Sequence, residues 1–223
     1  MNYSFSELLR LPLFLGMGRG EIDDIRQNAR LVSSHIKRGK MIVNAGQLCE
    51  SLIVVANGEV DCITQSDDNS YSMEEHLQAP LLIQPEHIFG IKQRYTMAYQ
   101  TRTHCDVIRI EKKMVMKLME ISMTFRLNYL NVITTMTQKL HGNIWHPMPE
   151  SIEKRIIRFV KDRSHYPAGS KSLRIKMNVM AKELGCSRLE VSEALHRLQD
   201  RKLIVMGRSC IRIPTLQQLL AYM

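Results

Sequence analysis

The sequence predicts an α+β protein with a β-rich first half, a long helix, and a last third of helices and short strands. Short apolar runs with a period of two lie between residues 35 and 110, no Gly or Pro stands from Glu111 to His141, and the end of the chain alternates helical and hairpin patterns. The chain has 223 residues, of which 44% are hydrophobic and 24% charged. This composition excludes a disordered or fibrous chain, and the length allows one large or two modest domains.

The positive charge is concentrated near the C-terminus. The chain has 31 Lys and Arg against 22 Asp and Glu, a net charge of +9, and residues 147–223 hold 15 of the basic and 7 of the acidic residues. A basic module joined to a near-neutral one is typical of nucleic-acid-binding proteins. Charge alone leaves open an anionic membrane surface, an acidic ligand or a merely solvated basic surface.

Several classes of protein are not expected from this sequence. The N-terminus lacks the basic start and apolar run of a secretory signal, and no segment approaches the ~18 apolar residues that span a bilayer. The cysteines form no CxxC pair, so we expect reduced thiols in a cytoplasmic protein at Cys49, Cys62, Cys105, Cys186 and Cys210.

The first 110 residues favour a small antiparallel barrel or jelly roll. Buried-strand runs are expected at 51–55, 59–64 and 104–110, and Asn57-Gly58 is a strong turn signal between the first two. Strands of this length at ~8–12-residue spacing are typical of such β folds.

The connecting segment predicts one long helix over 111–145 with an apolar seam at 3/4 spacing. The seam packs either on the chain's own barrel or on a second copy, and we favour a dimer helix because 30 residues span ~45 Å. Gly142 and the prolines of His146-Pro147-Met148-Pro149 end this helix and form a hinge. The seam residues are Met123, Leu130, Ile133, Thr137, Leu140 and Ile144.

The last 75 residues predict a helix–turn–helix followed by a two-stranded wing. Ser151 caps one helix, Asn178 caps the helix 179–184, and Ser187 caps a helix from Arg188 to about Arg201. Residues 203–206 and 210–213 form a hairpin. Helix–turn–helix units of this kind place their second helix in the major groove of DNA.

Two segments resemble known families. Residues 37–46 and 52–60, with Gly39, Gly46 and Gly58, are similar to the cyclic-nucleotide-binding fold, and residues 180–204 closely resemble the DNA-binding half of the Crp-Fnr family of bacterial transcription regulators. The resemblance implies a cyclic-nucleotide-binding-like jelly-roll sensor domain at 1–110, a dimerisation helix and hinge at 111–146, and a winged helix-turn-helix domain at 147–223. It also implies a homodimer on near-palindromic double-stranded DNA, RNA polymerase as a partner, and no enzymatic activity.

The ligand pocket that the resemblance implies is degenerate here. Ligand-binding relatives use a Glu after a Gly and an Arg that pairs with the phosphate. At these places the chain has Gly90-Ile91 and Tyr95-Thr96, and Arg94 would point to the opposite face of the strand. We therefore expect neither cyclic AMP nor another cofactor, and the barrel either senses a different effector or serves only as a dimer scaffold. We also expect no metal site, because no cysteine precedes Cys49 and the histidines have no spaced partners.

The resemblance carries base reading onto Arg188, Leu189 and Glu193, of which only the Arg matches the best-known relatives. Arg188 can bond guanine O6 and N7 together. The full set of expected DNA-binding residues is Lys176, Ser187, Arg188, Leu189, Ser192, Glu193, Arg197 and Arg208. The alternative is a non-enzymatic ligand-binding or adaptor protein with a vestigial DNA-binding half. An enzyme is disfavoured because paired carboxylates, a Ser/His/Asp order and a phosphate loop are missing from the sequence.

Overall fold

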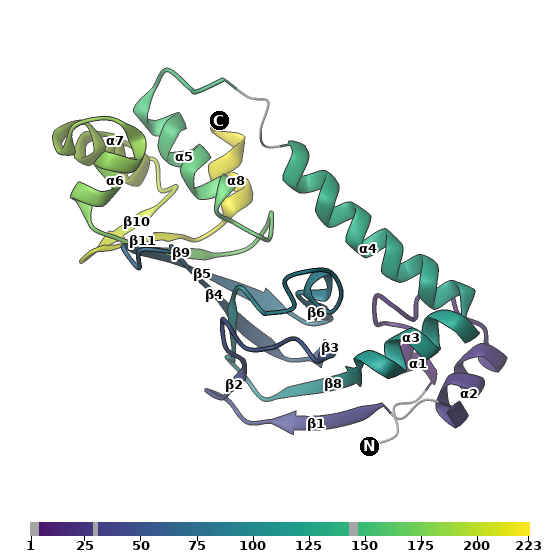
Figure 1. Cartoon of the computed structure of the whole chain (residues 1–223). Helices are drawn as coiled ribbons and strands as arrows, with labels where there is room; N and C mark the ends of the chain where they lie inside the picture. The colour runs from purple at the N-terminus through teal and green to yellow at the C-terminus, as the bar shows by residue number, and fades with distance from the viewer. Residues whose placement is uncertain (1–4, 29–30, 143–146) are drawn as a thin grey trace. The chain divides into compact units, whose positions relative to one another are not determined.

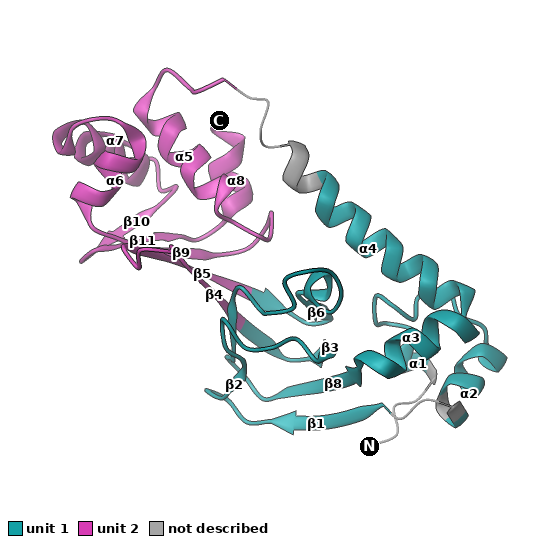
Figure 2. Cartoon of the chain, in the orientation of Figure 1, with its two compact units in different colours: residues 1–60, 77–144 teal, residues 61–76, 145–223 magenta. Residues whose placement is uncertain are grey.

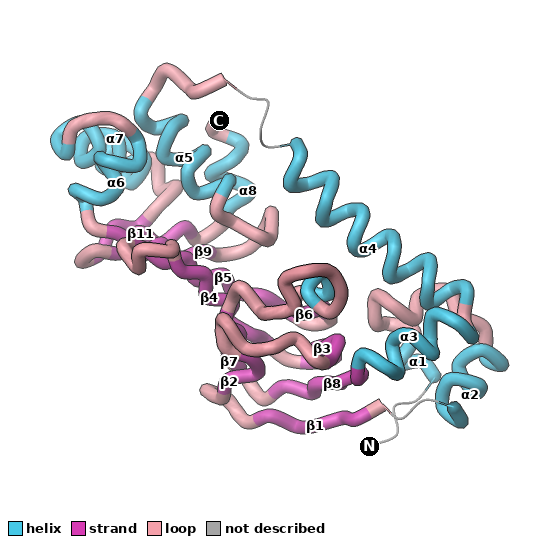
Figure 3. Tube along the Cα trace, in the orientation of Figure 1, coloured by secondary structure: helices cyan, strands magenta, loops and turns pink. Residues whose placement is uncertain are grey.

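The computed structural model describes residues 5–28, 31–142 and 147–223 (Figure 1). The chain divides into two compact units (Figure 2): unit 1 comprises residues 1–60 and 77–144, and unit 2 comprises residues 61–76 and 145–223. The described chain is a mixture of strands and helices (Figure 3), which confirms the predicted α+β class. The domain boundaries at 110 and 146 stay a prediction.

Unit 1 is built around antiparallel strands. One sheet has the order β1 (Val32–Ile36), β8 (Cys105–Glu111), β3 (Ser51–Asn57) and β6 (Leu81–Ile83), while β2 (Met41–Val43) pairs with β7 (Ala98–Thr101). Helices α1 (Phe5–Leu8) and α2 (Arg19–Asn28) precede the strands, and the 3-10 helix η1 (Pro85–His87) follows β6. In strand β3 the four consecutive residues from Leu52 to Val55 are all apolar and buried, which indicates that both faces of this strand are covered.

A tight turn at Asn57-Gly58 joins β3 to β4 (Glu59–Gln65), as the sequence predicts. Gly58 has a φ of +100°, and a Cβ at this position would lie 2.5 Å from the carbonyl oxygen of His104. Glycine is needed here for its backbone conformation and also for the close approach of the neighbouring chain.

The prediction of a single long helix over 111–145 is wrong, because the structure has two helices here, α3 (Lys112–Ile121) and α4 (Met123–Gly142). Ser122, between them, has the extended values φ −127° and ψ 113°. Its hydroxyl accepts a hydrogen bond from the Phe125 N–H at 3.0 Å and donates one to the carboxylate of Glu21. The serine side chain thus caps α4 and replaces the helical hydrogen bond that would have continued α3.

Helix α4 packs one face on the rest of unit 1. Phe125 is fully buried against Phe14 with ring centroids 5.7 Å apart, and the Tyr129 hydroxyl donates to the Pro85 carbonyl at 3.0 Å. The opposite face exposes apolar side chains at a/d spacing, with exposed fractions of 60% at Met123, 51% at Leu127 and 49% at Leu130. The intramolecular contact therefore uses other residues than the predicted seam.

The rest of that seam follows α4 toward its C-terminal end. Ile133 is half-buried and Thr137 is exposed. Leu140 lies within α4, but its side chain is outside the described residues, as is Ile144. Leu127 was missing from the predicted seam although it is half exposed beside Leu130.

Unit 2 contains the predicted helix–turn–helix with its wing. Its helices are α5 (Ile152–Asp162), α6 (Met177–Leu184), α7 (Arg188–Asp200) and α8 (Leu216–Ala221), and its strands are β9 (Lys171–Ile175), β10 (Val205–Gly207) and β11 (Cys210–Ile213). The sheet order is β10-β11-β9-β5-β4, where β5 is Tyr71–Gln78. The two strands of the wing are therefore continued by strands from much earlier in the chain.

The helix caps in unit 2 follow the sequence prediction in two places of three. Ser151 accepts a hydrogen bond from the Lys154 N–H at 3.3 Å, and Ser187 caps α7. The predicted cap at Asn178 is wrong, because α6 begins two residues earlier and Lys176 occupies the cap position without a side-chain hydrogen bond. In the described part of the chain, no helix combines the length and apolarity that a bilayer crossing needs.

Candidate nucleic-acid interface

The turn between α6 and α7 is fixed by two local features. Gly185 ends α6 with a φ of +64°, a left-handed conformation that favours glycine. Ser187 and Glu190 then form a capping box, in which the Glu190 N–H donates to the Ser187 hydroxyl at 3.2 Å and the Ser187 N–H donates to the Glu190 carboxylate at 2.8 Å. Hydrogen bonds from the Ser187 backbone and hydroxyl lower the pKa of Glu190.

The first turn of α7 exposes a guanidinium group and an apolar side chain to solvent. Arg188 is exposed, and no described residue forms a hydrogen bond or ion pair with its guanidinium. Leu189 beside it has 69% of its surface exposed. A guanidinium can bond guanine O6 and N7 together, and an apolar side chain can touch a thymine methyl group, so this turn can read base edges.

The apolar face of α7 packs in the core of unit 2 and so fixes the position of the first turn of this helix. Val191, Ala194, Leu195 and Leu198 are all buried in the core of unit 2. The buried members of α5 and α6 belong to the same core, so α7 presents its first turn from a packed base.

Two of the predicted contact residues are already paired with other side chains. The Arg197 Nε lies 2.5 Å from a carboxylate oxygen of Glu153, and its Nη1 lies 3.8 Å from Glu193. Partial burial raises the pKa of Glu153, but hydrogen bonds from its own backbone and from Arg197 outweigh this effect and leave the pKa lowered. Glu193 and Arg197 would have to give up these partners to contact DNA.

The other predicted DNA contacts occupy the edges of the same unit. Lys176 is exposed at the start of α6, and Arg208 is exposed in the β10–β11 turn, next to Ser209 with its φ of 53°. Ser192 is half-buried, and its carbonyl oxygen lies 2.7 Å from Nδ1 of His196. The exposed cations suit phosphate contacts on either side of a groove.

Strand β5 pairs with β9 over five residues, from Tyr71 opposite Ile175 to Glu75 opposite Lys171. Glu75 and Lys171 are completely buried and lie 2.6 Å apart. The Glu75 carboxylate also accepts the backbone N–H groups of His165 at 2.9 Å and Tyr166 at 3.1 Å. This pair was not predicted from the sequence, although a Glu between Met73 and Leu77 in an alternating run was a signal of a buried charge.

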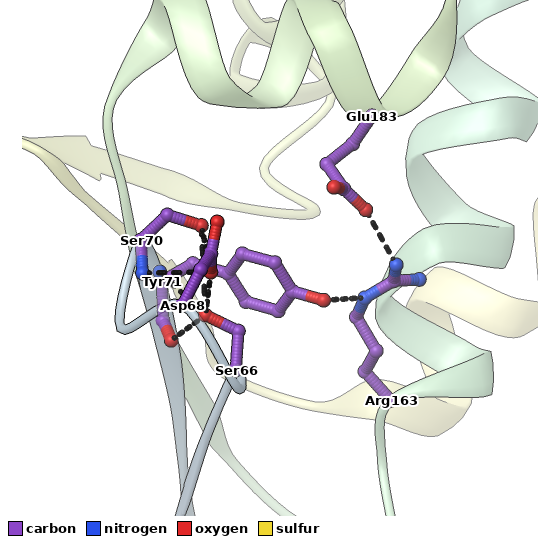
Figure 4. A network of polar contacts seen from close by, with 6 residues as sticks. All are labelled: Ser66, Asp68, Ser70, Tyr71, Arg163 and Glu183. Carbon is purple, nitrogen blue, oxygen red and sulfur yellow. Dashed lines mark hydrogen bonds and ion pairs between the residues drawn. The ribbon is translucent and has the colours of Figure 1, made fainter.

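Strands β4 and β5 form a hairpin, and a second set of polar contacts connects the end of this hairpin to the C-terminal end of α5 and to α6 (Figure 4). Arg163 donates to the Tyr71 hydroxyl at 2.9 Å and to the Glu183 carboxylate at 2.7 Å, and its guanidinium lies 3.7 Å from the centre of the Phe159 ring. In the hairpin turn, Asp68 accepts hydrogen bonds from Ser70 and Ser66, which lower its pKa to about 2. The β4–β5 turn is thus an ordered part of unit 2.

The predicted ligand-pocket residues of unit 1 do not form a common polar site. Tyr95 is buried, its hydroxyl donates to the Ser51 carbonyl at 2.9 Å, and burial followed by the hydrogen bond with Cys49 raises its pKa. Gly90 has a φ of +86°, Ile91 is fully exposed, and Thr96 contacts the side chain of Gln84. The exposed Arg94 donates to the Gly46 carbonyl at 2.8 Å.

Comparisons with known proteins agree with this description of unit 2. Residues 154–222 match the family model of the Crp-like helix-turn-helix domain. A search of curated proteins gave no match.

The solved structures to which this chain is similar include the catabolite activator protein of Thermus thermophilus, at 16% identity and a TM-score of 0.49, covering 94% of this chain and 96% of that one. FixK2 from Bradyrhizobium japonicum has 14% identity and a TM-score of 0.47, covering 86% and 96%. DNR from Pseudomonas aeruginosa has 15% identity and a TM-score of 0.44, with all of both chains covered.

The capped helix pair, the wing and the family match together identify residues 154–222 as a domain of the Crp-like helix-turn-helix class.

Proposed function

We propose that this protein is a homodimer that binds a specific near-palindromic DNA sequence and regulates transcription in the cytoplasm, with RNA polymerase as a further partner. The observation that carries sequence-specific binding is the exposed Arg188 on the first turn of α7, whose guanidinium has no hydrogen-bond or ion-pair partner among the described residues. A charge that already had a protein partner would read bases less readily, because it would first lose that ion pair.

The exposed face of α4 supports homodimerisation. This face carries apolar or uncharged side chains at alternating spacings of four and three residues, namely Met123, Leu127, Leu130, Thr134 and Thr137. Helix α4 contains no Asp or Glu that would oppose a second copy of the same face. A second copy of the same face satisfies a/d packing, as in a two-stranded coiled coil. The paired α7 helices would then enter successive major grooves about 34 Å apart.

The sensor site is proposed to be degenerate toward cyclic nucleotides. The Gln84 side chain, itself 2% exposed, accepts the N–H groups of Thr96 at 3.0 Å and Met97 at 3.1 Å and donates to the Thr96 hydroxyl. These donors are therefore satisfied within the protein, and the Glu and Arg of ligand-binding relatives are replaced. Cyclic AMP at millimolar concentration should cause no calorimetric heat of binding.

A selection from random duplexes tests the proposed function. The full-length protein is expected to enrich a palindrome whose half-sites are about one helical turn apart, with a Kd of roughly 10⁻⁸–10⁻¹¹ M at physiological salt. Failure to enrich any motif would contradict sequence-specific regulation and favour the adaptor alternative, which should also show almost no salt-dependent affinity for DNA.

A further inference from the structure

Three side chains of the β4–β5 hairpin converge on one face of the sheet in unit 2. Asp61 lies on β4, while Glu74 and His76 lie two residues apart on β5 and so point to the same side. Their potential ligand atoms all lie within 4.8 Å of one another, and all three residues are half-buried. Among the residues that the structure describes, this is the one such group.

The donor set fits a first-row transition-metal dication. An imidazole nitrogen with two carboxylate oxygens suits Zn²⁺ and its neighbours, whereas Mg²⁺ and Ca²⁺ prefer all-oxygen sites. Nδ1 of His76 already contacts a carboxylate oxygen of Asp61, and Glu74 lies on the same side of β5 as this pair. A cation among these groups would take the place of the direct His76–Asp61 contact and would offset two carboxylate charges.

The cluster is also connected to the wing sheet. Glu74 lies opposite Ser172 of β9, and its carboxylate is 3.8 Å from Nη2 of Arg174. Strand β9 in turn pairs with β11 of the wing. A metal ligated by Glu74 would compete with Arg174 for this carboxylate and would add positive charge to the DNA-binding unit.

We propose that Asp61, Glu74 and His76 form a binding site for a divalent transition-metal ion, which acts as an effector that strengthens DNA binding. The effector role rests on the proposed function. The metal site itself does not, so the two are measured separately.

Zinc binding to the full-length, chelator-treated protein is measured first by isothermal calorimetry in the absence of DNA. We expect one Zn²⁺ per chain, with affinity lowered at least about tenfold in Asp61→Asn, Glu74→Gln and His76→Gln. Co²⁺ should give no thiolate-to-cobalt absorption, which excludes the cysteines as ligands. His35→Gln is the matched control, because Nδ1 of His35 lies 2.8 Å from Asp106 in a histidine–carboxylate pair that no third described residue extends to a metal-binding group.

No zinc binding by the wild type, or equal binding by all three variants, would overturn the site. In a second arm, Zn²⁺ is expected to tighten DNA binding by at least about threefold in the wild type and His35→Gln but not in Glu74→Gln. Equal DNA affinity with and without bound zinc would overturn the effector role. Absence of DNA binding in both conditions would instead count against the proposed function.

Discussion

At the scale of residues, the Glu75–Lys171 pair is a fully buried ion pair between β5 and β9. Both side chains are fully buried, and the Glu75 carboxylate accepts two backbone N–H groups besides the ammonium. Lys171 also donates to the Ala168 carbonyl at 2.8 Å. Since nearly every bonding position is used, the pair depends on both partners being present.

Glu75→Gln is expected to lower the free energy of unfolding by about 3–5 kcal/mol, because it leaves the Lys171 charge buried without its counter-ion. Urea denaturation followed by circular dichroism measures this loss. Glu59→Gln on the preceding strand is the matched control, since Glu59 pairs with Arg102 at 3.9 Å in an exposed position and should change stability by less than about 1 kcal/mol. Similar losses in the two variants would contradict the role of the buried pair.

Individual site residues were predictable where they act through a local pattern. The turn Gly185-Cys186-Ser187 and the position of Arg188 follow from capping and turn chemistry within a few residues. The pairing of Arg197 with Glu153 was not predictable, because the two residues are 44 positions apart and meet only when α5 and α7 pack. The Asp61–Glu74–His76 cluster was missed for the same reason, although the Glu-x-His spacing on a strand was a signal.

At the scale of elements, helix α4 has one face that is buried within unit 1 and an opposite face that is exposed. Phe125 and Tyr129 pack on the rest of unit 1, whereas Leu127 and Leu130 lie on the exposed face of the helix. Leaving two half-exposed leucines on one helical face costs apolar burial that a second copy of the helix would recover.

The double variant Leu127→Glu, Leu130→Glu is expected to raise the dimer dissociation constant at least about 100-fold, because four leucines leave the symmetric interface and carboxylates oppose each other. Analytical ultracentrifugation measures the dissociation constant. Thr135→Glu is the control, since Thr135 is exposed and lies about 100° around the helix from the middle of the apolar face. A wild-type monomer, or an unchanged dimer in the double variant, would contradict dimerisation through this face.

The elements that the sequence predicted are those with a clear period or cap. Strands β3, β4 and β8, both helices of the helix–turn–helix and the wing hairpin were all expected. Strand β5 was missed because its sequence, YSMEEHLQ, is largely polar and is stabilised by pairing with β9, about 100 residues later. The break at Ser122 was missed because the serine hydroxyl that caps α4 is held by a tertiary contact with Glu21, 101 residues earlier in the chain.

At the scale of the whole molecule, the uneven charge predicts how DNA affinity depends on salt. Residues 147–223 carry 15 basic and 7 acidic residues, and Lys176 and Arg208 are exposed in unit 2. Each phosphate contact releases counterions, so affinity should fall steeply as salt rises.

Lys176→Ala is expected to reduce the slope of log K against log salt by about 2, one unit for each copy in the dimer, while leaving base preference unchanged. Fluorescence anisotropy across a salt series measures the slope. Arg38→Ala removes the same charge from an exposed turn of unit 1 and should leave the slope as it is. An unchanged slope in Lys176→Ala would show that this lysine does not contact phosphate.

The most direct measurement is the ratio of affinities for the selected site and a scrambled duplex, in wild type and in Arg188→Ala at one salt concentration. A lost bidentate contact costs about 1–3 kcal/mol, so two copies should lower the ratio at least about 30-fold. Arg38→Ala should keep the wild-type ratio. An unchanged ratio in Arg188→Ala would contradict the proposal that the first turn of α7 reads bases.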